Sequence, residues 1–201
     1  MKLYYMPGAC SLAPHIVANE AGIDLKLVKV DGKSKKTETD QDFLAVNPHG
    51  YVPTLELEDG QTLTEAQLVV QYLADQKPDS GLMPAAGEMA RYKAQQWLAF
   101  TSSELHKSFG AFFKPGSTDD AKAAAKEHLN KRFSYVDSEL AGKSYLMGET
   151  FTAADAYLWT ILSWTKFAGI DLSGFPNIQK YVGRIAERPA VIKTLQEEGL
   201  A

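Results

Sequence analysis

Strand-like patterns are confined to the first 77 residues of this chain of 201, and this restriction limits the folds that it can adopt. Near the N-terminus KLYYM predicts a strand, and DLKLVKVD predicts a second one further along. The segment between them carries Leu12, Ile16 and Val17 on one helical face, and Gly22 follows as a stop signal. Two strands joined through a helix require a crossover, so they are expected to lie parallel.

The next stretch, VPTLELEDGQTLTE, predicts an antiparallel hairpin, because Asp59-Gly60 is a two-residue turn signal between runs rich in Leu and Thr. Thr64 then precedes EAQLVVQYLADQ, which has the spacing of an amphipathic helix. The residues expected to face inward on this helix are Leu68, Val69, Tyr72 and Leu73. The first part of the chain is therefore an α/β unit in the order β-α-β, hairpin, helix.

A stretch dense in Pro and Gly, KPDSGLMPAAG, indicates a linker, and only helical patterns follow it. We therefore expect an α/β domain over residues 1–77, a linker over 78–87 and an all-helical domain over 88–201. The apolar residues expected on the first long helix of the second domain are Trp97, Leu98, Phe100, Leu105 and Phe109.

A helix that begins at Ala153 is apolar nearly all round, which indicates a buried centre for the helical domain. Thr152 and Asp155 are spaced as a capping box at its start, with Asp in place of the usual Glu or Gln. Pro176 and Pro189 stand at the expected starts of two later helices.

Charge and apolar patterning argue against several classes of partner. The net charge is −4 and Lys and Arg are scattered, so no nucleic-acid surface is expected. No apolar run approaches the ~18 residues of a membrane span, and Pro7-Gly8 interrupts the segment where a signal peptide needs continuous apolar residues. A lone cysteine makes no internal disulfide, which fits a reducing compartment, so we expect a cytoplasmic protein.

That single cysteine, Cys10, follows Pro7-Gly8 where a strand ends and a helix begins. A helix N-terminus lowers the pKa of a thiol, so Cys10 is a candidate reactive thiolate, although a lone cysteine is more often a small buried hydrophobe. Pro53 fits the first residue of a strand. Glu65 lies at the start of a helix, where it either interacts with the helix dipole or receives the ammonium group of a ligand.

Five segments together resemble the bacterial beta-class glutathione transferases over essentially the whole chain: YYMPGACSLAPHI, KKTETDQDFLAVNPHGYVPTLELEDG, LTEAQLVVQYLADQ, SELHKSF and FTAADAYL. The resemblance implies a thioredoxin-like domain followed by an all-helical domain. It also implies a homodimer that uses glutathione as co-substrate, with no permanently bound cofactor and no metal.

The resemblance further implies individual roles. Cys10, beside Ala9, lies next to the glutathione sulfur and can form a mixed disulfide with it, and His106 reaches toward the same thiol. The remaining expected glutathione contacts are the backbone of Val52, the cis proline Pro53, Glu65 and the N–H of Ala66 for the γ-glutamyl group, Lys35 for the glycyl carboxylate, and Lys107 for added positive charge. Ser103 and Glu104 are candidates for contacts across the dimer, whereas Tyr5 and Ser11 are secondary.

Two positions depart from the family pattern. Ala66 replaces a frequent Ser and Ala99 a frequent Asn, so one hydroxyl contact to glutathione and one polar contact across the dimer are lost. From pattern alone, a histidine beside Leu105 and Phe109 is more often a half-buried structural residue, and the resemblance reverses that interpretation for His106. His15 is expected to be structural, and His49 and His128 to lie at the surface.

An aromatic set could line an apolar electrophile pocket or belong to the core: Phe109, Phe112, Phe113, Trp164 and Phe167. The leading hypothesis is a transferase that adds glutathione to apolar electrophiles. A glutathione-dependent thiol-disulfide oxidoreductase is the second, because a cysteine beside glutathione favours mixed-disulfide exchange. A non-enzymatic binding module is the third.

Overall fold

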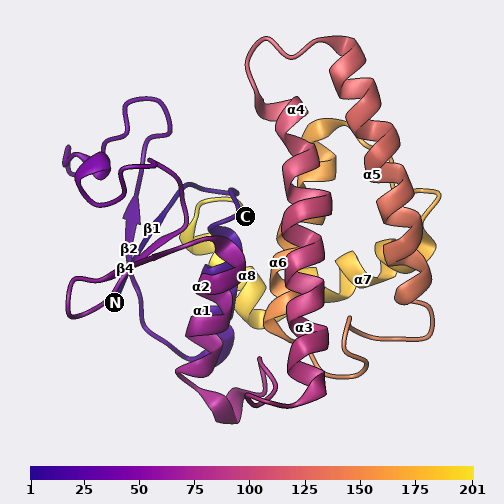
Figure 1. The fold of residues 1–201 in the computed structure, drawn as a ribbon, viewed down its shortest axis with the longest axis horizontal. Coiled ribbons are helices and arrows are strands. Elements are labelled where there is room, and N and C mark those ends of the chain that lie inside the picture. Colours follow the sequence, from indigo (N-terminus) through magenta and orange to yellow (C-terminus); the bar gives the residue numbers. More distant parts are fainter.

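The computed structural model describes all residues 1–201, and it places a small sheet on one side of a larger group of helices (Figure 1). The strands are β1 (Lys2–Tyr5), β2 (Lys26–Lys29), β3 (Thr54–Glu56) and β4 (Thr62–Thr64). The helices of the first part are α1 (Leu12–Ala21) and α2 (Ala66–Asp75). The helices of the second part are α3 (Met89–Phe100), α4 (Gly110–Phe113), α5 (Asp119–Glu139), α6 (Ala153–Ala168), α7 (Pro176–Ala186) and α8 (Pro189–Glu197). A thioredoxin-like unit followed by a helical domain is thus the observed architecture, as predicted.

The sheet has the strand order β2-β1-β3-β4. The crossover pair β1 and β2 is parallel, with Leu3 opposite Leu27, and β3 runs antiparallel to both β1 and β4. The parallel β1–β2 pair and the antiparallel β3–β4 hairpin were predicted from their connections, whereas the β1–β3 pairing was not predicted. Figure 1 shows α1 and α2 between the sheet and the helical part of the molecule.

The hairpin turn differs from the two-residue turn that Asp59-Gly60 suggested. The N–H of Leu57 donates to the carbonyl of Gln61 at 2.8 Å, so three residues, and not two, form the loop. Gly60 adopts a left-handed φ of 84°, and Asp59 accepts the N–H of Gln61 at 3.0 Å. A glycine in this conformation is typical of the three-residue hairpin, which explains why the same dipeptide serves a longer loop.

One residue of α2 was assigned to the wrong face. Leu68 is 47% exposed, because the buried stripe of this helix follows a different register. The buried positions are Ala66, Val69, Val70, Leu73 and Ala74, which recur at the i, i+3, i+4, i+7 and i+8 spacing. Tyr72 is half-buried at the margin of this stripe.

The predicted first long helix of the second part continues through Phe109 but changes its pitch twice. After α3 the residues Thr101–Leu105 form one π-helical turn, and His106–Phe109 form a 3₁₀ turn before α4. π turns are often found at functional sites, because the extra residue redirects the side chains that follow. Here the residue that follows the π turn is His106. No helix of the chain combines the length and the apolar character that crossing a membrane requires.

One apolar cluster of 38 buried residues joins the two parts of the molecule. It includes Leu3 of β1, Val17 of α1, Leu158 of α6 and Ile185 of α7. The connecting segment takes part in this packing, because Leu82 is buried and its carbonyl accepts the N–H of Ala153 at 2.8 Å. The connection is therefore docked on the start of α6.

The start of α6 carries the predicted capping box. The Asp155 carboxylate accepts the N–H of Thr152 at 2.8 Å and the Thr152 hydroxyl at 2.9 Å. It also accepts the N–H of Leu146 at 2.8 Å and the Tyr181 hydroxyl at 3.0 Å, contacts that the sequence pattern did not indicate. Burial raises the pKa of Asp155 to about 6, although all four donors act to lower it. Pro176 and Pro189 begin α7 and α8, as predicted.

Candidate active site

Cys10 lies in the tight loop between β1 and α1. The N–H of Ala9 donates to the carbonyl of Met6 at 3.0 Å, and the N–H of Leu12 donates to the carbonyl of Ala9 at 2.9 Å. This folding turns the Cys10 thiol toward the segment before β3, where Sγ donates to the Val52 carbonyl at 3.2 Å. The Val52–Pro53 peptide bond is cis, which confirms the expectation for Pro53.

The pKa of the Cys10 thiol is raised to about 12, whereas the sequence pattern predicted that a helix N-terminus would lower it. Burial is the largest cause, and the negative charge of Glu65 acts in the same direction. Backbone hydrogen bonds at Cys10 and Ser11 oppose the shift but do not reverse it. The structure therefore contradicts the prediction of a thiolate at Cys10, because desolvation outweighs the effect of the helix terminus.

Glu65 has an unusual backbone conformation immediately before α2. Its φ is 66° and its ψ is 111°, a combination that side chains other than glycine rarely adopt. Its side chain is exposed and makes no hydrogen bond within the chain. Strained backbone of this kind costs about 1–3 kcal/mol and is concentrated at ligand-binding positions. The first N–H groups of α2, beginning with Ala66, directly follow this residue in the chain.

Lys35 is the second candidate with a positive φ, at 57°. Its ammonium group donates to the carbonyl of Gly50 at 3.0 Å, so the side chain lies along the segment that leads to Val52. Lys35 therefore places a positive charge beside the same loop that the Cys10 thiol contacts.

The helical part contributes Trp164 and His106 to the other side of the Cys10 loop. The indole N–H of Trp164 donates to the carbonyl of Gly8 at 2.8 Å, which joins α6 to the loop directly. The His106 ring packs against Trp164 with the ring centroids 4.9 Å apart, and its Nδ1 lies 2.7 Å from the Tyr157 hydroxyl. Burial, and secondarily the charge of Lys107, lower the pKa of His106 to about 4. The imidazole is therefore neutral at pH 7.

Ser103, Glu104 and Lys107, the other candidates near His106, make their contacts within the helical part and not with the Cys10 loop. Ser103 and Lys107 are exposed, and the Ser103 hydroxyl donates to the carbonyl of Ala99 at 3.0 Å. Glu104 pairs with Arg132 of α5 at 2.7 Å and lies 3.7 Å from His128. No hydrogen bond or ion pair links any of these side chains to the first 77 residues.

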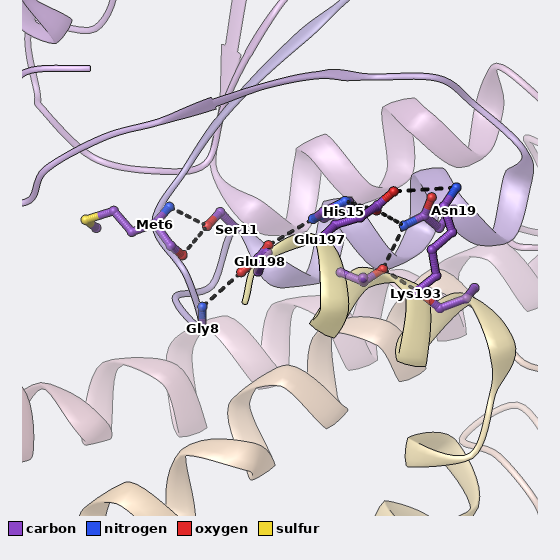
Figure 2. A network of polar contacts seen from close by, with 10 residues as sticks. Met6, Gly8, Ser11, His15, Asn19, Lys193, Glu197 and Glu198 are labelled. Atoms are coloured by element: carbon purple, nitrogen blue, oxygen red, sulfur yellow. Dashed lines mark hydrogen bonds and ion pairs between the residues drawn. The ribbon is translucent and has the colours of Figure 1, made fainter. Parts of the chain in front are cut away.

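A polar network at the end of α8, absent from the sequence-based predictions, holds the Cys10 loop from a third direction (Figure 2). The Glu198 carboxylate accepts the N–H of Gly8 at 2.9 Å and contacts His15 Nδ1 at 2.9 Å. His15 Nε2 contacts Glu197 at 2.8 Å, so the predicted structural role of His15 is confirmed. Within the loop, the buried Ser11 hydroxyl contacts the carbonyl and the N–H of Met6, each at 3.2 Å. No sequence motif marks Glu198, since its partners Gly8 and His15 are 190 and 183 residues away in the chain.

Aromatic side chains extend outward from His106 as a continuous wall. Trp164 packs edge-on against Phe113 at 5.1 Å and against Phe109 at 5.6 Å, and Phe113 contacts Phe167 at 5.6 Å. Phe109 is fully buried, so it supports the wall from behind, whereas Phe113 is 42% and Phe167 80% exposed. The wall is thus apolar, and its outer end is open to solvent.

Comparisons with known proteins point to one family, with matches in both parts of the chain. The family model described as the glutathione S-transferase N-terminal domain matches residues 3–81, and the one described as the C-terminal domain matches residues 100–189. A curated relative, the glutathione S-transferase GstA of Escherichia coli O157:H7, is 44% identical over 200 residues, with both chains covered completely.

Solved structures give the same result. A ternary complex of BphK, described as a bacterial GST, superposes with a TM-score of 0.98 at 52% identity over the full length of both chains. A beta-class glutathione S-transferase from Sphingomonas chungbukensis superposes with a TM-score of 0.97 at 48% identity, again over the full length of both.

Proposed function

Since this chain belongs to the glutathione S-transferase family, and is thus an enzyme that uses glutathione as its co-substrate, we propose that it conjugates glutathione to apolar electrophiles beside Cys10. The observation that carries this proposal is the Trp164 bridge. Its indole N–H binds the Gly8 carbonyl at 2.8 Å, and its ring is the first member of the aromatic wall. One side chain therefore places an apolar surface next to the loop that holds the thiol site.

Glutathione binds along the first domain in this proposal. The exposed, unpaired Glu65 carboxylate receives the γ-glutamyl ammonium, and the N–H of Ala66 binds the adjacent carboxylate. The backbone of Val52 pairs with the cysteinyl unit, whose sulfur lies beside Cys10. Lys35, Ala9 and Lys107 complete the contacts. The strained φ of Glu65 supports its assignment, since no interaction within the chain accounts for it.

The electrophile binds against Trp164, Phe113 and Phe167, with Phe109 behind them. Planar apolar molecules suit such a surface, because offset or edge-on ring contacts contribute about 0.5–1.5 kcal/mol beyond the burial of area. His106, at the inner end of the wall, is the residue that we assign to the sulfur itself.

A specific observation separates transfer from disulfide exchange. Exchange requires Cys10 as a thiolate, and burial raises the pKa of that thiol to about 12. Transfer requires only the thiolate of glutathione. We therefore place the glutaredoxin-like activity second. There is also no second cysteine to resolve a mixed disulfide, so a second glutathione would have to do so.

The test measures both activities on the same preparation: conjugation of glutathione to 1-chloro-2,4-dinitrobenzene and reduction of a glutathione mixed disulfide. Wild type is expected to conjugate, and Cys10→Ala is expected to retain conjugation while losing any exchange. Trp164→Ala is expected to lose conjugation, because it removes both the wall and the Gly8 contact. Exchange without conjugation in the wild type would make the oxidoreductase the correct assignment.

We also place a homodimer interface on the α3 face. A groove of about 620 Å³ between α3 and α5 is lined in part by Trp97, Phe100 and Tyr135. Ser103 follows Phe100 by three residues on the same segment, and Glu104 adjoins it. Phe100→Glu is expected to convert a dimer into monomers in light scattering. A reducing cytoplasm, rich in glutathione, is the compartment that suits a free thiol and this co-substrate.

A further inference from the structure

His106 is held by contacts on one ring nitrogen and one ring face. Its Nδ1 lies 2.7 Å from the hydroxyl of Tyr157, a residue of α6 that is only 1% exposed. The ring also packs edge-on against Trp164 at a centroid distance of 4.9 Å. No other side chain or backbone group of the chain forms a hydrogen bond with the imidazole, so Nε2 is the nitrogen left for a ligand.

The neutral imidazole carries one proton, and its contacts decide which nitrogen holds it. The Tyr157 hydroxyl contacts His106 Nδ1 and has no other hydrogen-bond partner in the chain. Burial raises the pKa of Tyr157, so the phenol keeps its proton and needs an acceptor for it. His106 Nδ1 is the only acceptor within hydrogen-bond distance of the phenol, so the phenol proton goes to Nδ1 and the ring proton stays on Nε2.

We infer that Tyr157 is a positioning residue for the proposed transferase reaction: its hydroxyl donates to His106 Nδ1, keeps the ring proton on Nε2, and makes His106 a hydrogen-bond donor to the glutathione sulfur. This inference rests on the proposed function. Glutathione then binds as its thiolate, and the thiol proton leaves to solvent. A donor aimed at the sulfur stabilises the charged form and lowers the pKa of the bound thiol.

The competing role for His106 is that of a general base, with the proton on Nδ1 and the Nε2 lone pair facing the thiol. A thiol has an ordinary pKa of about 8.5, and burial lowers the pKa of the His106 imidazole to about 4. Transfer of the thiol proton to this imidazole is therefore unfavourable by a factor of roughly 10⁴. The surrounding ionisable groups also favour His106 as a hydrogen-bond donor over His106 as a general base. Lys107 disfavours protonation of the ring, and Cys10 and Glu65, which face Tyr157, raise the pKa of the phenol.

The first measurement reads the tautomer directly in the free protein. In ¹⁵N NMR of the side chains at pH 7, the chain shows only four histidines, and loss of one signal set in His106→Gln identifies the relevant one. Wild type is expected to show a protonated Nε2 and an unprotonated Nδ1. A proton on Nδ1 in wild type would overturn the inference. This result does not depend on catalysis, so it stands apart from any failure of the proposed function.

The second measurement is the pH profile of kcat/KM for conjugation. Tyr157→Phe keeps the ring packing and removes only the hydroxyl, so KM for glutathione is expected to stay near that of wild type. The apparent pKa of the bound thiol is expected to rise, and kcat/KM at pH 6.5 to fall about tenfold.

Tyr92→Phe is the matched control, because this tyrosine is 58% exposed and its hydroxyl forms no hydrogen bond. It is expected to reproduce the wild-type tautomer and pH profile. An unchanged profile and tautomer in Tyr157→Phe would remove Tyr157 from the mechanism. If Tyr157→Phe does not fold, the wild-type tautomer alone decides the question.

Discussion

At the scale of single residues, the sequence predicted which side chains lie close together in the folded chain better than it predicted their protonation. Cys10, Val52 and Pro53 were predicted from their motifs, and the structure brings them together, with a cis bond before Pro53. The direction of the Cys10 pKa was wrong, because it depends on how much solvent the folded chain leaves around the sulfur. Position along the sequence does not contain that information.

The raised pKa gives a prediction for the reactivity of Cys10. With a pKa of about 12, the thiol holds almost no thiolate at pH 7, so iodoacetamide is expected to alkylate it far more slowly than free cysteine. Mass spectrometry against time at pH 7 and pH 9 measures the rate, with the urea-unfolded protein as the control that reacts normally. Alkylation of the native protein at the rate of an ordinary thiol would show that Cys10 is not desolvated.

Glu65 gives a second prediction, in which charge and backbone strain are separated. Glu65→Gln keeps the size of the side chain and removes its charge, so glutathione affinity is expected to fall at least tenfold, about 1.4 kcal/mol. Glu65→Gly is expected to lose the same affinity but to melt at a higher temperature than Glu65→Ala, because glycine adopts a φ of 66° without strain. Calorimetry and melting curves on the three variants provide the comparison. Full affinity in Glu65→Gln would leave this residue with a structural role only.

At the scale of elements, the sequence predicted which segments form helices and which form strands, but it did not predict a change of helical pitch within one helix. Gly22 ends α1 in the left-handed conformation with φ 65°, as expected of a glycine stop. The π turn at Thr101–Leu105 left no comparable signal, because a helix with one extra residue per turn keeps the same apolar residues. The same turn places His106, whose partner Tyr157 lies 51 residues away.

The start of α6 provides a prediction at this scale. Asp155→Ala removes the acceptor for four donors at a buried helix end, and the cost is expected to be about 2 kcal/mol or more. The folded pKa of about 6 lies above the ordinary 3.8, so the contribution of this carboxyl is fully present in acid and is lost as pH rises through 6. The cost of the substitution is therefore expected to be about 1 kcal/mol larger at pH 5 than at pH 7.

Urea denaturation at both pH values measures this difference, and glutathione binding on the same variant is expected to stay near that of wild type. Thr118→Ala is the matched control, since Thr118 caps the exposed start of α5 by accepting the N–H of Ala121 at 3.2 Å. It is expected to cost about 1 kcal/mol at either pH. Equal costs at pH 5 and pH 7 for Asp155→Ala would contradict the raised pKa of Asp155.

At the scale of the whole molecule, one common core joins the two parts, which the Pro- and Gly-rich connection did not indicate. Sequence patterns show where one type of structure gives way to another, but they do not show which faces meet. Here the common core and the contacts of Trp164 and Glu198 with Gly8 fix the helical part against the thiol loop. The site is therefore built from both parts, and its geometry depends on their docking.

This docking predicts that the two parts unfold together. All three tryptophans lie after residue 88 and the only cysteine is Cys10, so fluorescence reports the helical part and thiol labelling reports the first part. Separating the two parts would expose the faces of α1 and α6 that share the 38-residue cluster, which makes a half-unfolded state costly. The two probes are expected to give the same midpoint in urea at a fixed protein concentration. Glu198→Ala, which frees the N–H of Gly8, is expected to lower both midpoints equally. Labelling of Cys10 at a lower urea concentration than the loss of fluorescence would mean that the first part unfolds alone, and that the common core does not couple the two.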